Sequence, residues 1–457
     1  MLVSYSRKLA TPIILALLIS YISSYLGINP TSCKTLFVTV ICAFWWVLEP
    51  IPIAATSLIP LALFPLLGVL NVEELASAYG HPLILLLMGG FMLSKALEQS
   101  NTHKRLALYM INIFGQGSDR GLVGGFMITS AILSMWISNT ATTLMLLPVA
   151  LAIIDQSKGE HLSTPLLLGI AYASSLGGIG TPIGTPPNLI LMSVYTENTG
   201  RIISFSQWAK WSIPVIIVVL PIMFVWLTRN LKTKQSFRLP SNSAWSAKEK
   251  RILGIFILTA LAWITRTEPF GGWKELLSIS FANDTSVAMA SVLALFIIPD
   301  GQGSSLLDWE TANKIPWHVV LLFGGGIAIA KAFVSSGLSD EISSFIVQFR
   351  GYPTLSIVAI LTLAISFLTE LTSNTATTNL LMPILAATAT SANLDPAILM
   401  VPAAMAASCA FMLPVATAPN TIIFGSQKVP IKSMLREGLV LNLVAVLAII
   451  LVCHFLF

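Results

Sequence analysis

The chain has 457 residues, of which 55% are hydrophobic and only 10% are charged, and its mean hydropathy is +0.83. A soluble domain carries about 25% charged residues, so this composition excludes an ordinary soluble protein and predicts one that crosses a membrane many times. The formal net charge of +5 arises from lysines and arginines between apolar runs. That pattern is typical of membrane orientation signals and does not indicate a nucleic-acid partner.

Hydrophobic runs predict the elements of the first half of the chain. Residues 10–27 follow Arg7 and Lys8 as in a secretory signal, but more apolar runs come directly after them, so we expect a retained first membrane helix. The basic amphipathic segment 103–115 is expected to lie along the membrane surface. Further membrane helices are predicted at 35–48, 51–70, 82–99, 164–195 and 208–228.

A long polar stretch then divides the chain. Residues 231–251 are rich in lysine and arginine, and we expect them to form a cytoplasmic linker. After the linker the pattern of apolar runs begins again. It predicts membrane helices at 252–265, 285–299, 316–336, 396–425 and 434–457.

One polar hexapeptide occurs twice inside apolar sequence. Residues 138–143 and residues 373–378 both read Ser-Asn-Thr-Ala-Thr-Thr, 235 positions apart. The apolar flanks of the first copy are roughly 15 residues long, too short to span a bilayer, which takes about 20 residues. We therefore predict two re-entrant hairpins, 121–155 with its tip at 138–140, and 353–391.

Other short blocks repeat at nearly the same offset. Gly89-Gly90 matches Gly325-Gly326 at offset 236, and Pro187-Asn188 matches Pro419-Asn420 at offset 232. Such internal similarity indicates two structural repeats, and an odd number of spans in each would invert the second repeat in the membrane. The predicted fold is an all-α polytopic membrane protein with eleven transmembrane helices and two re-entrant hairpins in an inverted-topology repeat. Its expected divisions are a first helix at 1–30, repeat 1 at 31–230, the linker at 231–251, and repeat 2 at 252–457.

The distribution of lysine and arginine sets the expected orientation. With eleven spans and a cytoplasmic N-terminus, most of the 25 basic residues fall on the cytoplasmic side, as the positive-inside rule requires. The C-terminus then lies outside. We expect a multi-pass protein of the bacterial inner membrane.

Broken helices supply the expected binding chemistry. The sequence predicts four helix interruptions: the two hairpin tips and two proline-containing loops, 184–188 and 416–420. Free amides at such breaks favour anions and free carbonyls favour small cations, and oxygen-only ligands suit a hard cation such as sodium. A single Ser-Asn-Thr would more often be helix-to-helix packing. Its duplication beside a second proline-broken helix favours a site.

Predictions for a few other residues follow from their positions. Glu370 precedes the second tip, and Met135 stands at its position in repeat 1, so a proton or cation site and a structural hydrogen bond are both open. Glu49 and Asp284 stand at span ends and are expected to face water or cap helices. The four cysteines are expected to be buried free thiols. The chain has no HExxH, GxSxG or P-loop motif, which argues against an enzyme.

The paired Ser-Asn-Thr tips, each followed by a G/A-T-x-P-N loop, resemble the divalent anion:sodium symporters, the sodium/dicarboxylate cotransporter family. The resemblance covers essentially the whole chain after the first helix. It implies a homodimer in which each protomer has a scaffold domain and a transport domain that moves like an elevator. It also implies co-transported sodium ions and a dicarboxylate anion. One departure is Ala418, where the family often has a proline, as at Pro186, and this leaves the anion preference more open.

The resemblance assigns the site residues position by position. The implied first sodium site uses Ser134, Ser138, Asn139 and the backbone of Gly184, and the second uses Thr369, Ser373, Asn374 and the backbone of Ala416. The implied substrate ligands are Asn139, Thr140, Thr185, Asn374, Thr375 and Thr417.

The predicted function is sodium-coupled uptake of C4-dicarboxylates such as succinate, malate or fumarate. A dicarboxylate exchanger of the same family, without net sodium entry, is the nearest alternative, and sulfate or citrate is an alternative substrate. An anion channel and an intramembrane enzyme are less consistent with hairpins that close the site from both sides.

Overall fold

The computed structural model describes residues 2–114, 118–156, 160–231, 244–268, 271–341 and 353–457. Within these ranges the chain is helical, with no strand beyond an isolated bridge between Pro299 and Ser305. The predicted all-α class is therefore confirmed. Most of the expected linker, 231–251, lies outside the described residues.

The first half of the chain contains a series of long and short helices. In order they are α1 (Leu2–Tyr25), α2 (Pro30–Leu48), α3 (Ile53–Thr56), α4 (Ile59–Leu66), α5 (Val72–Tyr79), α6 (Pro82–Gln99), α7 (Thr102–Phe114), α8 (Asp119–Ser134), α9 (Asn139–Gln156), the 3-10 turn η1 (Glu160–Leu162), α10 (Ser163–Gly178), α11 (Pro186–Thr199) and α12 (Phe205–Thr228).

The second half has a related order of helices. They are α13 (Ala247–Ile264), α14 (Gly272–Leu276), α15 (Asp284–Ile297), α16 (Trp309–Ala312), α17 (Trp317–Ser335), α19 (Thr354–Leu368), α20 (Asn374–Ser391), α21 (Ala397–Ser408), α22 (Ala418–Gly425) and α23 (Ile431–Leu456).

The expected third span, 51–70, is wrong as a single helix. The structure divides it into α3 and α4 around Ser57 and Leu58, and Pro60 occupies the first turn of α4. A proline fits a helix start because it has no amide hydrogen to leave unpaired, whereas inside a helix it removes a hydrogen bond. Together the two helices still form an apolar unit.

Six described helices are long and apolar enough to cross a membrane, and several shorter apolar helices accompany them. Among them are α12, which has 24 residues, and α23, which has 26. At 1.5 Å per residue each exceeds the roughly 30 Å of a bilayer core. These helices support a multi-pass membrane protein, and the number of eleven spans remains a prediction.

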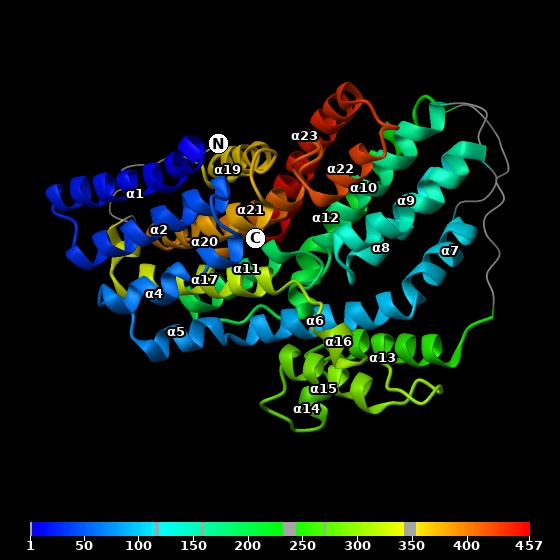
Figure 1. The fold of residues 1–457 in the computed structure, drawn as a ribbon, viewed down its shortest axis with the longest axis horizontal. Helices are drawn as coiled ribbons and strands as arrows, with labels where there is room; N and C mark the ends of the chain where they lie inside the picture. The colour runs from blue at the N-terminus through cyan, green and yellow to red at the C-terminus, as the bar shows by residue number, and fades with distance from the viewer. Residues whose placement is uncertain (1, 115–117, 157–159, 232–243, 269–270, 342–352) are drawn as a thin grey trace.

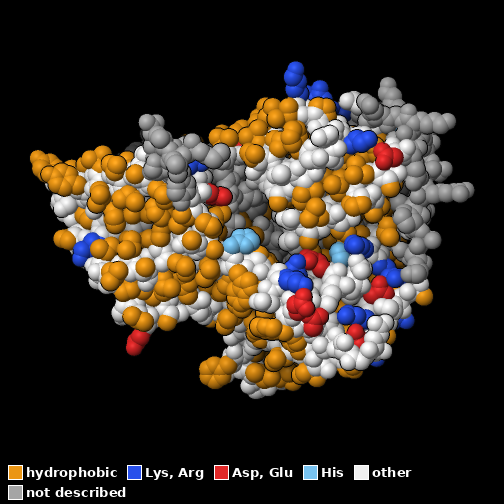
Figure 2. Space-filling model, viewed as in Figure 1, with side chains coloured by type: hydrophobic (Ala, Val, Ile, Leu, Met, Phe, Trp, Pro, Cys, Tyr) orange, Lys and Arg blue, Asp and Glu red, His pale blue; other side chains and the backbone are white. Residues whose placement is uncertain are grey.

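The helices gather into groups (Figure 1). The helices α8, α9, α10, α12, α22 and α23 lie together on one side, whereas α1, α2, α4 and α5 lie on the other. Within the first group α10 packs against α8, α9 and α22, and α17 packs against α5 and α20 in the second. Hydrophobic side chains cover most of the face in Figure 2, and charged side chains gather mainly over α6, α13 and α16. An apolar exterior with charge confined to limited areas suits a protein surrounded by lipid.

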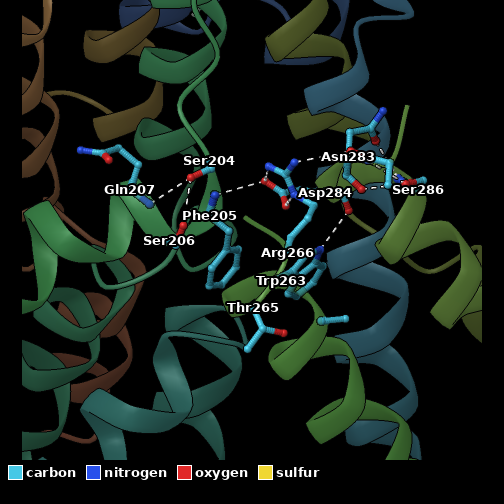
Figure 3. A network of polar contacts seen from close by, with 12 residues as sticks. Ser204, Phe205, Ser206, Gln207, Trp263, Thr265, Arg266, Asn283, Asp284 and Ser286 are labelled. Carbon is cyan, nitrogen blue, oxygen red and sulfur yellow. Dashed lines mark hydrogen bonds and ion pairs between the residues drawn. The ribbon is translucent and has the colours of Figure 1, made fainter. Parts of the chain in front are cut away.

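A buried ion pair connects three helix ends (Figure 3). Arg266, just after α13, donates from Nε to Asp284 Oδ1 at 2.6 Å and from Nη2 to Oδ2 at 3.3 Å, and both side chains are 8% exposed. The backbone N–H of Phe205, at the start of α12, donates to Asp284 Oδ2 at 3.1 Å. Of the two expectations for Asp284, facing water is wrong, because the buried carboxylate neutralises Arg266. Capping a helix is confirmed, because the carboxylate accepts from the first N–H of α12. Glu49 is exposed and ends α2 in a left-handed conformation.

Candidate functional site

A cavity of about 790 Å³ lies where the two polar hexapeptides and the two proline-containing loops meet. Ten of the predicted site residues line it: Ser138, Asn139, Thr140, Gly184, Thr185, Ser373, Asn374, Thr375, Ala416 and Thr417. The two other predicted residues, Ser134 and Thr369, are completely buried and contact the cavity residues from behind. Segments more than 230 positions apart in sequence therefore share one site.

The first hairpin tip joins α8 to α9. Ser134, the last residue of α8, donates from Oγ to Asn139 Oδ1 at 2.6 Å, and Asn139 is the first residue of α9. Ser174 on α10 lies 3.2 Å from Ser134 Oγ and donates to the Asn139 carbonyl at 2.9 Å. Four oxygen atoms thus lie close together at the first tip: the hydroxyls of Ser134 and Ser174, and the side-chain and backbone carbonyls of Asn139.

The second hairpin tip joins α19 to α20 with corresponding contacts. The single hydroxyl proton of Thr369 is shared between two acceptors, Asn374 Oδ1 at 2.5 Å and the Ala407 carbonyl at 3.0 Å from Oγ1. Asn374 is the first residue of α20, as Asn139 is of α9. The serine hydroxyl of Ser174 has no counterpart here, since the residue 232 positions later is Ala406.

The two loops after α10 and α21 are folded by one repeated contact. Asn188 donates from Nδ2 to the carbonyls of Gly178 and Thr181 at 3.0 and 2.7 Å. Asn420 does the same to the carbonyls of Ala410 and Leu413 at 3.2 and 3.0 Å. Each asparagine belongs to the first turn of the helix after the loop, so it fixes the loop to that helix. This clamp holds Gly184 and Ala416 buried beside the two tips.

Two helices begin at the cavity. The first residues of α11 are Pro186 and Pro187, whereas α22 begins with Ala418 and Pro419. A proline has no amide hydrogen, so the second helix carries one N–H in its first turn that the first helix lacks. The Thr417 hydroxyl accepts from the Asn420 N–H at 3.2 Å, whereas Thr185 makes no such cap.

Gly178 allows the close approach of α10 to the first tip. A Cβ atom at this position would lie 2.6 Å from Asn139 Oδ1, within the range that real side chains do not occupy. The glycine is therefore required by the position of Asn139, and this explains the Gly-rich end of α10.

Aromatic side chains distinguish the two tips. Trp136, at the first tip, stacks on Phe205 and Trp263 with ring centroids at 5.7 and 6.5 Å, and meets the edge of Phe256 at 5.3 Å. Leu371 stands at the corresponding position of the second tip, and it is 74% exposed. The first tip is thus docked on α12 and α13, and the second is not docked in this way.

Charged residues mark both ends of α6 and α17. At one end Lys95, Glu98, Lys314 and His318 line the cavity, and Lys95 pairs with Glu98 at 2.6 Å. At the other end Glu197 lies 3.6 Å from both His81 and Lys331. Sequence reasoning did not assign these groups or Ser174 to the site, because none belongs to the duplicated hexapeptide, although Lys95 and Lys331 match each other at offset 236.

The donor set does not suit a transition metal. Among the described residues there is no group of three or more His, Cys, Asp or Glu side chains that could hold one. The tips instead present hydroxyl, amide and peptide oxygens, which are ligands for hard cations. All four cysteines are buried and free.

Comparison with known proteins identifies relatives over nearly the whole chain. A family model described as citrate transporter matches residues 43–399. The sodium-dependent dicarboxylate transporter SdcS of Staphylococcus saprophyticus is 41% identical over 447 residues, covering 92% of this chain and 85% of that protein. The protein of the same name from Staphylococcus aureus strain MRSA252 is 40% identical over 446 residues, with the same coverage.

A solved structure shares the fold at low sequence identity. The YdaH transporter of Alcanivorax borkumensis superposes with a TM-score of 0.59 and 13% identity, covering 84% of this chain and 86% of that one. That transporter is described as having an unusual topology. The similarity supports the helical membrane-transporter fold.

Proposed function

The chain belongs to the divalent anion:sodium symporter family, and from this premise we propose that it is a secondary transporter that carries C4-dicarboxylates such as succinate, malate and fumarate into the cell together with sodium ions. It is a transport protein and not an enzyme. The observation that carries the proposal is the cavity in which both polar tips and both loop ends meet. The name of the staphylococcal relatives supports the ion and the class of substrate.

In this proposal the oxygen clusters behind the two tips receive the sodium ions. The first site comprises Ser134, Ser138, Asn139 and the Gly184 carbonyl, and the second comprises Thr369, Ser373, Asn374 and the Ala416 carbonyl. The close contacts of Asn139 Oδ1 and Asn374 Oδ1 with buried hydroxyls support both sets. Hard oxygen ligands without a thiol or imidazole suit sodium.

The same two asparagines link the cations to the anion. Each Oδ1 is engaged by a buried hydroxyl, and within the described residues no protein group accepts a hydrogen bond from either Nδ2. The amide hydrogens are thus free for a carboxylate in the cavity. The proposed substrate ligands are completed by four threonines: Thr140, Thr185, Thr375 and Thr417. Bound sodium would balance the charge of the dicarboxylate and orient the amides that hold it, which couples the two.

The proposed setting follows from the symmetry of the chain and the family. We place the protein in the bacterial inner membrane as a homodimer, with the N-terminus in the cytoplasm and the C-terminus outside. Two inverted repeats would place the tips near the middle of the bilayer. Movement of the helices that carry the cavity, relative to the rest, would then expose the site alternately in an elevator-type cycle.

Uptake of radiolabelled succinate into proteoliposomes tests the proposal. An inward sodium gradient should drive accumulation, a potassium gradient should not, and malate and fumarate should compete. Asn139→Ala and Asn374→Ala should each abolish uptake. Asn198→Ala should leave it intact, since this α11 side chain donates to the Val194 carbonyl and does not line the cavity. Equal uptake with sodium and potassium, or full activity in both cavity variants, would contradict the proposal.

Citrate is the second candidate substrate, because the matching family model is described as a citrate transporter. Citrate competing more strongly than succinate for sodium-driven uptake would favour it, and the same assay extends to sulfate. Counterflow that needs an internal dicarboxylate but ignores sodium would instead indicate an exchanger.

A further inference from the structure

A buried carboxylate connects the second hairpin tip to the second loop. Glu370, 2% exposed, follows Thr369 and accepts three hydrogen bonds: from the Met412 N–H and the Leu413 N–H, each at 2.9 Å, and from Asn442 Nδ2 at 2.6 Å. Every partner is a donor, so the arrangement suits the ionised carboxylate, which has no proton to give. Of the two interpretations that the sequence left open, the hydrogen-bonded one is observed.

Further hydrogen bonds fix the backbone of residues 411–416 around this carboxylate. Asn442, on α23 and completely buried, accepts from the Phe411 N–H at 3.0 Å. The clamp of Asn420 holds the Leu413 carbonyl, and this same carbonyl accepts from the Ala416 N–H at 3.2 Å. The carboxylate is therefore one hydrogen-bonded turn away from Ala416, and it is adjacent in sequence to Thr369.

The first repeat makes the corresponding connection without a charge. Met135 stands 235 positions before Glu370, and Thr181 stands 232 positions before Leu413. Here the Thr181 hydroxyl donates to the Met135 carbonyl, so a neutral side chain on the loop reaches the backbone of the tip. In the second repeat a charged side chain on the tip reaches the backbone of the loop. The direction of the connection is reversed, and a charged side chain takes the place of a neutral one.

The negative charge of Glu370 has no basic partner in the part of the chain that the structure describes. Among the described residues no lysine, arginine or histidine lies within ion-pair distance of it. By contrast Glu437, the other buried carboxylate near this end of α23, pairs with Arg229 at 2.8 Å and with Arg436 at 2.6 Å. An unpaired charge in a protein interior is costly, and a cation bound beside it would lower that cost.

We propose that Glu370 is a positioning residue for the second cation site, where its carboxylate holds residues 412 and 413 against the tip and its charge raises the sodium affinity of this site above that of the first. The inference rests on the proposed function, because it deepens the assignment of Thr369, Ser373, Asn374 and Ala416 to a sodium site. Glu370 itself does not line the cavity.

The test measures sodium activation of succinate uptake by the full-length protein in proteoliposomes. Glu370→Gln keeps the size of the side chain but removes the charge and turns one acceptor into a donor that faces a backbone N–H. The sodium concentration for half-maximal uptake should rise at least tenfold, as expected from the loss of one charge-assisted hydrogen bond. Sodium should also raise the thermal stability of the variant less than that of the wild type.

Two further variants separate charge from position. Glu370→Asp keeps the charge and should recover part of the sodium affinity. Asn442→Ala keeps the charge but removes one donor, and should raise the half-activating sodium concentration by a smaller factor, about threefold. Glu437→Gln is the matched control, since it neutralises a buried carboxylate that is already paired, and its sodium activation should stay within about twofold of wild type.

The outcomes distinguish this inference from the proposed function. A wild-type protein without sodium dependence refutes the function, whatever the variants do. A sodium-dependent wild type with an unchanged half-activating concentration in Glu370→Gln refutes the inference, even if the variant is less stable, since that result assigns Glu370 a structural role only. Should Glu370→Gln fail to fold, wild-type sodium activation in both Glu370→Asp and Asn442→Ala refutes the inference in its place.

Discussion

Replacing Arg266 by leucine should destabilise this protein less than replacing Asp284 by leucine. The two side chains form a buried pair with contacts at 2.6 and 3.3 Å, each 8% exposed. Removal of one partner from a buried ion pair costs about 3–5 kcal/mol, because the other charge stays buried alone. The two remaining charges, however, are not equally well placed.

Asp284 keeps favourable partners when Arg266 is absent. It is the first residue of α15, where the helix dipole favours a negative charge by about 0.3–1 kcal/mol and up to about 2. It also keeps the Phe205 N–H at 3.1 Å. Within the described residues, the Arg266 side chain without Asp284 keeps only the Ala282 carbonyl as an acceptor, at 3.5 Å. We therefore expect a cost of about 2–3 kcal/mol for Arg266→Leu and about 4–5 kcal/mol for Asp284→Leu.

Thermal unfolding of the purified protein in detergent measures these costs, with the fraction of monodisperse protein as the readout. The double variant should be more stable than Asp284→Leu alone, because it leaves no buried charge. Lys210→Leu is the control, since its pair with Glu268 is about half exposed, at 55% and 45%, and should cost under about 1 kcal/mol. Equal costs for the two single variants, or a double variant with the sum of both, would refute the reasoning.

Three further predictions concern the site and its surroundings. Gly178→Ala should strongly reduce succinate uptake while the protein still folds, because the new methyl group displaces Asn139 Oδ1; normal uptake would show that this amide is not needed in its present position. Glu197→Gln should lower the unfolding free energy by about 1–3 kcal/mol, between the values for exposed and buried pairs, because Glu197 faces Lys331 and His81. Glu310→Gln is the control, since its pair is exposed, and it should change the unfolding free energy by less than about 0.5 kcal/mol. The Thr311 N–H holds the pKa of Asp308 below its usual range, so the stability from this group is present above pH of about 4 and is lost as the pH falls further. Below that pH the melting temperature of Asp308→Asn should depend less on pH than that of wild type.

Repetition in the sequence carried most of the information about the site. The duplicated hexapeptide and the proline-asparagine pairs belong to segments that the structure brings into one cavity. A polar motif inside apolar sequence must be satisfied by protein, ion or ligand, and this requirement marked the segments as a candidate site. Hydrophobic runs likewise predicted the all-helical class. Neither signal says which helix faces which.

Residues outside the duplicated motifs were therefore not predictable. Ser174 gains its role only because α10 packs on α8, and nothing in the sequence distinguishes it from Ser175 beside it. The position of Asp284 at a span end predicted a water-facing or helix-capping residue, and its partner Arg266 was one of many basic residues that fit an orientation signal. Charge patterns place residues relative to the membrane, but they do not reveal pairs across helices.

The aromatic contacts of Trp136 bear on the energy balance between conformations. An aromatic pair contributes about 0.5–1.5 kcal/mol beyond the area it buries, so contacts with Phe205, Phe256 and Trp263 amount to about 1.5–4.5 kcal/mol. Moving a two-state equilibrium from 1:99 to 99:1 takes about 5.5 kcal/mol. In a protein that alternates between two conformations, rings on one tip alone would thus set much of the resting population. Leu371 provides no aromatic contact at the other tip. Binding of substrate and cations would therefore have to shift an equilibrium in which one conformation is already the more stable.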